Sequence, residues 1–576
     1  MKRKTLFTLL AFLVMASMVL TACQPAATPA PTEAPPAEKP TEAAPPTEAP
    51  TAVPPTEAPK YEGLTVTAPN CDYGGIMKEI AAVDALTVRF SLCVPDPAFL
   101  SKVAFSVFAI QPREWIEKNE GGNALIEQPI GTGAFMLDKW NRGDSITFKR
   151  FDDYWGEKAK VSTVVFRWSA ESAARLLELQ SGTVDGIDNP APEDFAVIEA
   201  DATLQLKPRQ AMNIFYVGMT NTFPPFDNVK VRQAVAMAID RQRIIDTFYP
   251  VGSSVATHFT PCFIPNGCTG DEWYKFDPVA AKALLAEAGF PDGFETKITY
   301  RDVVRGYLPK PGDVATDIQA QLLENLGIKA EIVVMESGAF LEESAAGRVE
   351  GLHLLGWTAD YPHITNFLDY HFGKNQKQFG DSYPEIYENL LKGAQIADPK
   401  AAEEFYIAAN NAIKELVPMV AIAHGGSGVA YRADVEGGHA SPLGNEYFGV
   451  VKPGDRDTFV WMQNGEPPNL YCADETDGEA LRACEQVLEA LYSYEVGGTA
   501  YQPALATSCE PNADLTEYVC KLREGVKFHD GSDLDANDVV MSYSVLWDAS
   551  SPYHKGNTGA FEYWVTLWNN FINAPE

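Results

Sequence analysis

The stretch CKLREGVKFHDGSDLDANDVVMSYSVLWDA, residues 520–549, predicts a strand, a turn and a helix close to the end of a chain of 576 residues. Residues 520–528 alternate as a strand does, and residues 529–531 have the composition of a turn. Asp535 is a predicted helix N-cap, with Asp538 three residues later. The apolar face of this helix is made of Val539, Tyr543, Leu546 and Trp547. Only 27 residues follow, so the unit needs a packing partner from elsewhere in the chain.

The N-terminus has the features of a secretion signal. Residues 2–4 are basic and residues 6–20 are apolar, a length that is short for a bilayer span and typical of a signal peptide. The apolar segment ends in LTAC, which resembles the lipobox of bacterial lipoproteins. We therefore expect residues 1–22 to be cleaved off and Cys23 to carry lipid on its sulfur. The alternative is a membrane-spanning anchor beside an incidental cysteine.

Residues 23–60 form a low-complexity segment in which PTEAP recurs at Pro31, Pro46 and Pro55. Such a segment cannot bury a core, and its prolines favour an extended polyproline II conformation. At about 3.1 Å per residue it could reach on the order of 100 Å. We expect a spacer between the membrane and the body, although a disordered tail with no other role has the same composition.

The body, residues 61–576, is long enough for two or three packed domains. Strands and helices interleave along it, which indicates the α/β class. The formal net charge of −33 argues against nucleic acid as a partner. No dinucleotide loop, phosphate-binding loop or nucleophile elbow occurs, and the histidines are not at metal-ligand spacings. We therefore expect no enzyme activity, no cofactor and no metal.

Apart from Cys23, eight cysteines fall into four pairs that are close in sequence and placed about turn residues. The predicted disulfides are Cys71–Cys93, Cys262–Cys268, Cys472–Cys484 and Cys509–Cys520. The signal peptide implies an oxidising compartment, in which such bridges persist. Eight unrelated free thiols are the alternative.

Motifs along nearly the whole body resemble the family 5 extracellular solute-binding proteins of ABC importers, the peptide and nickel type. The most characteristic is PIGTGAFMLDKWNRGDSITFKRFDDYWG, residues 129–156. The motifs that follow in family order are LLELQSGTVDGID, PPFDNVKVRQAVAMAIDRQRII, DPVAAKALLAEAGFPDGF, DIQAQLLENLGIKAEI, GWTADYPHITNFLDYHFG and SPLGNEYF. Each motif alone is weak, and together they are highly specific.

The order of the motifs departs from the family. DTFVWMQNGEPPNLY and the Cys520 region resemble the beginning of a mature family member, yet here they follow SPLGNEYF, which resembles the family's end. Each motif occurs once, so we interpret the order as a circular permutation, with the original ends joined near residues 450–456. The Cys520 strand and its helix should then pack on the Cys71–Cys93 hairpin. A rearranged or misassembled gene is the alternative.

The resemblance implies an α/β protein of the type II periplasmic-binding-protein fold, with two lobes that close on a ligand. An extra small subdomain belongs to lobe I. We expect lobe I to comprise residues 61–258 and 429–576, and lobe II residues 259–428.

The resemblance also implies the ligand site. In peptide-binding members, an aspartate at the position of Asp360 pairs with the ligand's N-terminal ammonium. We expect Gly356, Trp357, Thr358 and Tyr361 to line the site with it. From lobe I we expect Asn221, Asn464, Gly465 and Glu466 to face the cleft. For Trp357 a core position, and for Glu466 an ordinary surface position, are the alternatives.

Two departures keep the ligand class open. His363-Ile364 stands where many relatives have Asp-Pro, and Gly312-Asp313 stands where the family's dipeptide binders have an arginine for the ligand carboxylate. A peptide is the expected ligand, and another cationic or neutral solute is the alternative. The expected partners of this monomer are ABC permease subunits and their ATPase, with the membrane reached through lipid. A surface sensor or a lipid-anchored hydrolase are the other functions considered.

Overall fold

The computed structural model describes residues 61–574, which belong to one compact unit of the chain. The predicted signal peptide, the predicted lipidation site Cys23 and the predicted linker lie outside the described residues. Within residues 61–574, no helix combines the length and the apolar content that crossing a bilayer requires.

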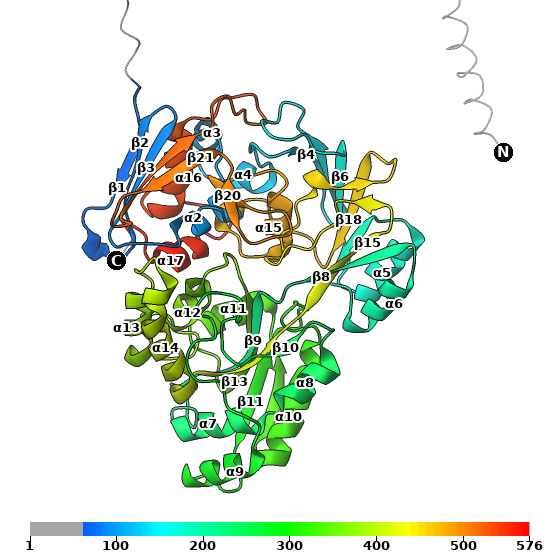
Figure 1. Ribbon diagram of the computed structural model, residues 1–576, viewed down its shortest axis with the longest axis vertical. Helices are drawn as coiled ribbons and strands as arrows, with labels where there is room; N and C mark the ends of the chain where they lie inside the picture. The colour runs from blue at the N-terminus through cyan, green and yellow to red at the C-terminus, as the bar shows by residue number, and fades with distance from the viewer. Residues whose placement is uncertain (1–60, 575–576) are drawn as a thin grey trace, which may run out of the picture. The chain divides into compact units, whose positions relative to one another are not determined.

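Lobe I is built on a seven-stranded mixed sheet with the order β4-β5-β6-β18-β7-β15-β8 (Figure 1). At its centre β18 pairs in parallel with β6 and β7, and the outer pairings are antiparallel. Helices α5 (Ser172–Ser181) and α6 (Phe195–Ala200) lie at the β7 and β8 end. The strands are β4 (Phe135–Asn141), β5 (Ser145–Arg150), β6 (Thr163–Trp168), β18 (Thr458–Gln463), β7 (Gly186–Asp188), β15 (Ser427–Arg432) and β8 (Leu204–Arg209).

Lobe II is built on a six-stranded sheet with the order β10-β14-β9-β13-β11-β12. Its strands are β10 (Ser254–Val255), β14 (Met419–His424), β9 (Asn213–Met219), β13 (Leu352–Thr358), β11 (Glu295–Tyr300) and β12 (Lys329–Val334). Its helices are α7 (Val229–Ala238), α8 (Arg241–Phe248), α9 (Pro278–Glu287), α10 (Pro311–Leu326), α11 (Ser337–Ala345), α12 (Ile364–Phe372), α13 (Pro384–Gly393) and α14 (Pro399–Leu416).

The structure corrects the predicted start of lobe II. Strand β9 lies between β13 and β14, all of its residues are buried, and the cores of α7 and α8 join the same hydrophobic cluster. The lobe II core therefore begins at Met212, not at residue 259. The apolar run NIFYVGM suits either sheet, so its sequence did not reveal which sheet it joins.

Two chain crossings connect the lobes, one from β8 to β9 and one from β14 to β15. The Asn213 side chain holds the crossings together, because its Nδ2 donates to the Gly425 carbonyl at 2.7 Å and its Oδ1 accepts from the Gly425 amide at 2.8 Å.

Beside the crossings, lobe I encloses a network of four charged side chains. Arg209 Nη2 donates to Asp188 Oδ1 at 3.0 Å and to Glu446 Oε1 at 2.6 Å. Arg482 Nε donates to Glu446 Oε2 at 2.7 Å, and its Nη2 donates to Asp188 Oδ2 at 2.9 Å. All four are buried, and the two positive and two negative charges balance. Such a network is costly to break from one side, because a buried charge then loses its partner.

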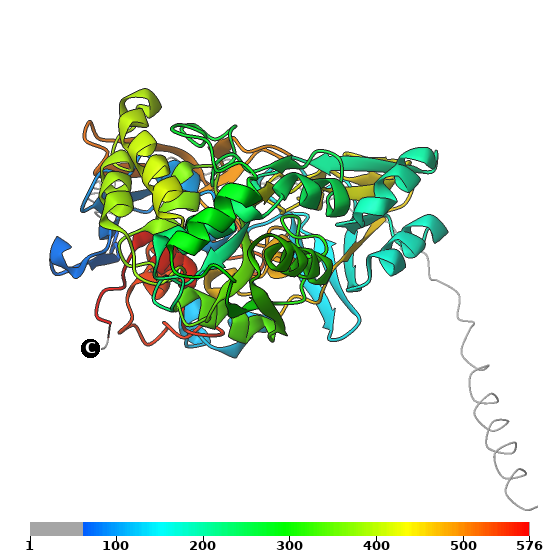
Figure 2. The ribbon, with the colours of Figure 1, turned by 90° about the horizontal axis from the view of Figure 1, so that it is seen from below.

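A third, five-stranded sheet answers the question raised by residues 520–549. Its order is β1-β2-β3-β22-β21, so strands from both ends of the body pair in one sheet. In particular, Cys520 of β22 is opposite Val88 of β3. Figures 1 and 2 show the blue early strands beside the orange and red late segments. The elements are β1 (Thr65–Thr67), β2 (Met77–Asp84), β3 (Thr87–Leu92), β22 (Glu517–Leu522), β21 (Ala506–Pro511), α16 (Ala536–Trp547) and α17 (Glu562–Trp568).

Helix α16 completes this small subdomain and has the predicted capping box of Asp535 and Asp538. Its Asn537 side chain accepts from the Leu64 amide at 2.7 Å and donates to the Glu62 carbonyl at 3.2 Å, so the start of the body packs on the late helix. The predicted packing of the Cys520 unit on the Cys71–Cys93 hairpin is thus confirmed. That the order arose by circular permutation stays a prediction.

The four predicted disulfides are confirmed. Their Cα–Cα distances are 5.5 Å for Cys71–Cys93, 4.8 Å for Cys262–Cys268, 6.3 Å for Cys472–Cys484 and 3.9 Å for Cys509–Cys520. The first and last of them brace the small sheet, whose strands come from opposite ends of the body.

The remaining short elements are η1 (Cys71–Tyr73), α2 (Phe99–Lys102), η2 (Ser106–Phe108), α3 (Arg113–Lys118), α4 (Asn123–Glu127), η3 (Pro192–Asp194), β16 (Val435–Glu436), η4 (Phe448–Val450), β17 (Lys452–Pro453), η5 (Cys472–Asp474), α15 (Gly478–Cys484), β19 (Tyr492–Tyr494) and β20 (Tyr501–Pro503).

Candidate ligand site between the lobes

Asp360 lies two residues after the end of β13 of lobe II and faces lobe I, where it contacts Tyr563. Its Oδ2 accepts from Asn366 Nδ2 at 2.9 Å, while its own amide donates to Asn366 Oδ1 at 3.0 Å. Its Oδ1 accepts from the Tyr563 hydroxyl of α17 in lobe I at 2.7 Å. The carboxylate is therefore held from both lobes, and its side-chain partners among residues 61–574 are neutral donors.

Burial raises the pKa of Asp360 from 3.8 to about 7, although the hydrogen bonds from Asn366 and Tyr563 oppose the rise. A carboxylate that is removed from water and lacks a cation resists ionisation. A cation bound beside Asp360 would therefore stabilise the ionised form of its carboxylate.

Tyr563 is a residue that sequence reasoning missed as a site member. Like its neighbours Phe561, Trp564 and Trp568 it is a buried aromatic residue, which suits a core position. Its ring packs against Phe105, with 4.8 Å between ring centroids, while its hydroxyl reaches the carboxylate of lobe II. The signal that could have identified it is the hydroxyl, because a buried tyrosine needs a polar partner.

Trp357 forms an aromatic wall beside Asp360. Its ring stacks on Tyr370 of α12 with a centroid distance of 3.9 Å, and its Nε1 donates to Asn366 Oδ1 at 3.0 Å. It is half-buried and packs against the hydrophobic clusters of both lobes. Trp357 therefore combines features of both alternatives: it lies beside Asp360 as a wall of the site would, and it packs against the hydrophobic cores.

The backbone of Gly356 and Thr358 lies on a strand edge that is only partly paired. β13 pairs with β9 from Leu352 to Thr358, but with β11 only at Leu352 and His353. A side chain at Gly356 would collide with the Tyr307 ring and with the Ile214 carbonyl, each 2.3 Å from the position of a Cβ. Glycine therefore permits close packing here, and the other edge of the strand from residue 354 onward has no strand beside it among the described elements.

Tyr361 is buried, and its hydroxyl lies 2.9 Å from Thr365 Oγ1. Although it belongs to lobe II by sequence, it packs into the hydrophobic cluster of lobe I. Its position favours a role in the contact between the lobes.

Asn221 does not lie where we predicted it. It follows β9 in lobe II, and its Nδ2 donates to the Asp381 carbonyl while its Oδ1 accepts from the Asp381 amide, each at 2.8 Å. Both ends of its amide therefore hold a turn of lobe II. It does not face the cleft from lobe I.

Glu466 is likewise engaged elsewhere. Its carboxylate accepts from Trp140 Nε1 at 3.0 Å and from the Gly143 amide at 3.0 Å, which fastens the β4–β5 hairpin of lobe I. This supports the alternative, an ordinary surface acid, here with a structural role in the hairpin. Of its neighbours, Asn464 has a buried Oδ1 without a hydrogen-bond partner among the described residues, and Gly465 has open space where a side chain would extend.

A second polar contact joins the lobes. Arg305, in the segment after β11, lies 3.6 Å from Asp477 and 3.5 Å from Glu479 of lobe I. Burial raises the pKa of Asp477 to about 7, with Glu479 adding to the rise and Arg305 opposing it. Arg305 was not among the predicted site residues, and its partners are more than 170 positions away in the sequence.

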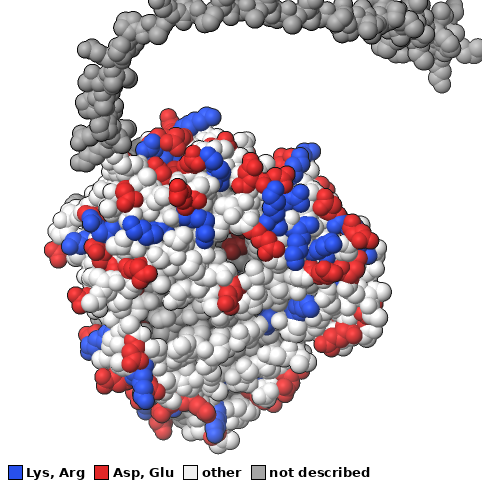
Figure 3. Space-filling model, turned by 45° about the horizontal axis from the view of Figure 1, so that its top comes forward, with Lys and Arg blue, Asp and Glu red and all other residues white. Residues whose placement is uncertain are grey.

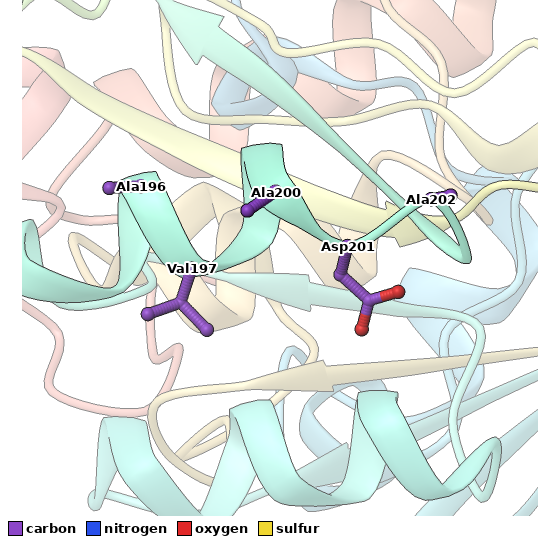
Figure 4. Close-up of a pocket in the computed structure, with 5 residues that line it drawn as sticks. All are labelled: Ala196, Val197, Ala200, Asp201 and Ala202. Carbon is purple, nitrogen blue, oxygen red and sulfur yellow. The ribbon is translucent and has the colours of Figure 1, made fainter.

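Other features are less suited to a ligand. A surface hollow on α6, lined by Ala196, Val197, Ala200, Asp201 and Ala202, offers one ionisable side chain (Figure 4). His258 lies within 4.8 Å of Cys262 and Cys268, but these sulfurs are bonded to each other and do not act as thiolate ligands. On the face shown in Figure 3, acidic side chains lie inside a hollow near the middle of the body.

Relatives of known sequence match most of the body. The profile of the bacterial extracellular solute-binding proteins, family 5 Middle, matches residues 44–379 and 500–569. A dipeptide-binding protein of Pseudomonas aeruginosa is 33% identical over 395 residues, which cover 66% of this chain and 73% of the relative. A dipeptide-binding protein of Escherichia coli is 30% identical over 381 residues, covering 65% of this chain and 71% of the relative.

Solved structures agree. A dipeptide binding protein from a Pseudoalteromonas species in complex with Met-Leu superposes with a TM-score of 0.61 and 27% identity, over 66% of this chain and 76% of that one. A periplasmic binding protein from Helicobacter pylori in complex with the peptide STSA superposes with a TM-score of 0.58 and 25% identity, over 72% and 74%. The predicted type II periplasmic-binding-protein fold is confirmed. The chain belongs to the family 5 bacterial extracellular solute-binding proteins.

Proposed function

We propose that this protein is a lipid-anchored receptor outside the cell membrane that binds a short peptide between its lobes and delivers it to an ABC permease. The observation that carries the proposal is the Asp360 carboxylate, which is buried between the lobes and contacted only by neutral donors among the described residues. A peptide's N-terminal ammonium supplies the missing positive charge.

The ammonium would take the place of a weaker partner. In the structure the Tyr563 hydroxyl donates to Asp360 Oδ1. A charged donor makes a hydrogen bond roughly twice as strong as a neutral one. The unpaired edge of β13 from residue 354 onward then offers backbone groups to an extended peptide, a mode that tolerates many side chains.

Arg305 is the group that a ligand's carboxylate would meet. It extends from lobe II toward the acids Asp477 and Glu479 of lobe I. Arg305 and Asp360 both belong to lobe II, so the two ends of a peptide would be held by the same lobe. Arg305 would thus bind the ligand's carboxylate in place of an arginine at residues 312–313, where this chain has Gly312 and Asp313.

The remaining partners follow from the rest of the chain. The lipid at Cys23 would hold the monomer at the membrane, and the proline-rich residues 24–60 would give the body its reach. Permease subunits and their ATPase would take the ligand, since importers of this kind have separate chains for these tasks.

The test is calorimetric titration with a pool of di- and tripeptides and with the same pool after N-acetylation. Acetylation removes the ammonium charge and keeps the rest of the peptide, so we expect roughly 100-fold weaker binding or more. Equal binding of both pools would rule out an ammonium partner for Asp360. Heat from neither pool, in protein confirmed to be folded and ligand-free, would rule out a peptide receptor.

Affinity should also depend on pH, with a sign fixed by Asp360. Its pKa of about 7 means that the ligand-free carboxylate is largely protonated at pH 5, whereas ammonium binding requires the ionised form. Glu562 from α17 faces the same carboxylate and reinforces the shift. We expect affinity to rise about 50-fold from pH 5 to pH 7, with about one proton released per peptide bound near pH 6.

Calorimetry in two buffers of different ionisation enthalpy measures that proton. Asp360→Asn serves as the control, because it has no carboxylate to deprotonate. A wild-type affinity that is flat between pH 5 and pH 7 would contradict the assignment.

A further inference from the structure

Helix α17 contributes two neighbouring side chains to the contact with lobe II. Tyr563 donates to Asp360, and Glu562 accepts from the Tyr370 hydroxyl of α12 at 3.4 Å. Tyr370 stacks on Trp357, and Trp357 and Asp360 share Asn366 as a partner. The two carboxylates are therefore linked through a wall of two stacked aromatic rings.

This arrangement is short of positive charge. The residues that contact the two carboxylates, namely Asn366, Tyr563 and Tyr370, are all neutral. Within residues 61–574, neither Asp360 nor Glu562 forms an ion pair with a lysine, arginine or histidine, although thirty other ion-pair contacts occur there. A single ligand ammonium would compensate Asp360 and leave Glu562 without a counter-charge.

Glu562 differs from Asp360 in being exposed to solvent. Its contact with Tyr370 is long for a hydrogen bond to a carboxylate, so a charged donor could replace it without loss. The stacked rings of Trp357 and Tyr370 are each half-buried, so part of this aromatic pair is accessible to a planar cation. A guanidinium or ammonium over such a face gains roughly two- to fivefold in affinity at an exposed site.

We propose that the first residue of the bound peptide carries a second positive charge, the side chain of lysine or arginine, which lies between the Trp357–Tyr370 pair and Glu562. The inference rests on the proposed function, because it requires the N-terminal ammonium on Asp360. The site would therefore prefer short ligands that carry two positively charged groups. A free diamine shares this chemistry, and the experiment separates the two sources.

The test compares four ligands by calorimetry: Arg-Ala, citrulline-Ala, Ala-Ala and 1,5-diaminopentane. Citrulline keeps the shape of arginine and lacks its charge. Wild type should bind Arg-Ala about 5- to 10-fold more tightly than citrulline-Ala, as suits an exposed ion pair that also contacts an aromatic face. In Glu562→Gln this ratio should fall to roughly two- to fivefold, the part that the aromatic face contributes by itself.

Two controls keep the result clear. Glu404→Gln removes the same charge from the exposed surface of α14 and should leave the ratio unchanged. Binding of citrulline-Ala by Glu562→Gln at wild-type strength shows that this variant is folded and still holds the ammonium.

The outcomes distinguish this inference from the proposed function. If Arg-Ala, citrulline-Ala and Ala-Ala bind equally, the second charge is refuted and the peptide receptor stands. If none of the peptides binds, the proposed function fails. If diaminopentane binds as tightly as Arg-Ala while citrulline-Ala and Ala-Ala do not bind, the ligand is a diamine and the peptide form of the inference is overturned.

Discussion

Replacement of Asp360 by asparagine is expected to weaken peptide binding by roughly two to three orders of magnitude. The amide keeps the shape and can still accept from Tyr563, but it leaves the ligand's ammonium buried without a counter-charge. Breaking such a pair from one side costs about 3–5 kcal/mol. Calorimetric titration with the peptide pool at pH 7 measures the loss.

The same variant provides an internal check on the mechanism. N-acetylation of the peptides should weaken binding by wild type strongly and by Asp360→Asn little, because the charge that acetylation removes has no partner left in the variant. Glu466→Gln is the matched control. Since Glu466 fastens the β4–β5 hairpin, this change should alter affinity by less than about 1 kcal/mol. Wild-type affinity in Asp360→Asn would mean that the ammonium binds elsewhere.

The second large effect concerns stability. Glu446→Gln removes one of the two negative charges that face Arg209 and Arg482 inside lobe I. Among the described residues, Asp188 is then the one carboxylate still in ion-pair contact with the two buried guanidinium groups, and we expect the free energy of unfolding of lobe I to fall by about 3–5 kcal/mol. Denaturant titration gives this value from the midpoint and slope of the transition.

Two further variants sharpen this prediction. Glu404→Gln, on the exposed face of α14, should change stability by no more than about 0.5 kcal/mol. The double variant Glu446→Met with Arg482→Met keeps the Arg209–Asp188 pair balanced, so its loss should be smaller than the sum of the two single changes. A loss below 1 kcal/mol in Glu446→Gln would show that solvent reaches the network.

The sequence was informative wherever the determining contacts are local. The capping box at Asp535 and the four disulfides depend on residues that are close in the chain, and each was predicted correctly. The pairing of β22 with β3 was predicted from the order of family motifs, since no local pattern specifies a partner so far away.

The errors have a common physical cause. The amide of Asn221 and the carboxylate of Glu466 have their hydrogen-bond partners 160 and 323 positions away, so their surroundings could not be inferred from neighbouring residues. Tyr563 was missed for the same reason, because its hydroxyl meets Asp360 from a position 203 residues away. Strand β9 was assigned to the wrong lobe because an apolar run fits either sheet equally well.

The small sheet has a consequence for the order in which the protein can fold. A chain is synthesised from its N-terminus, so β3 is complete long before β22, the strand that covers its edge, has been made. The Gln111 amide and the Ser542 hydroxyl, which bond in the finished structure, are 431 residues apart. Until the last helices emerge, the β2–β3 hairpin presents an unpaired edge of the kind that promotes association between chains. Contacts of such long range also slow folding. Cys71 and Cys93 are only 22 residues apart, so their disulfide can form before β22 has been synthesised. It can then hold the β2–β3 hairpin together until the other strands of the sheet pair with it.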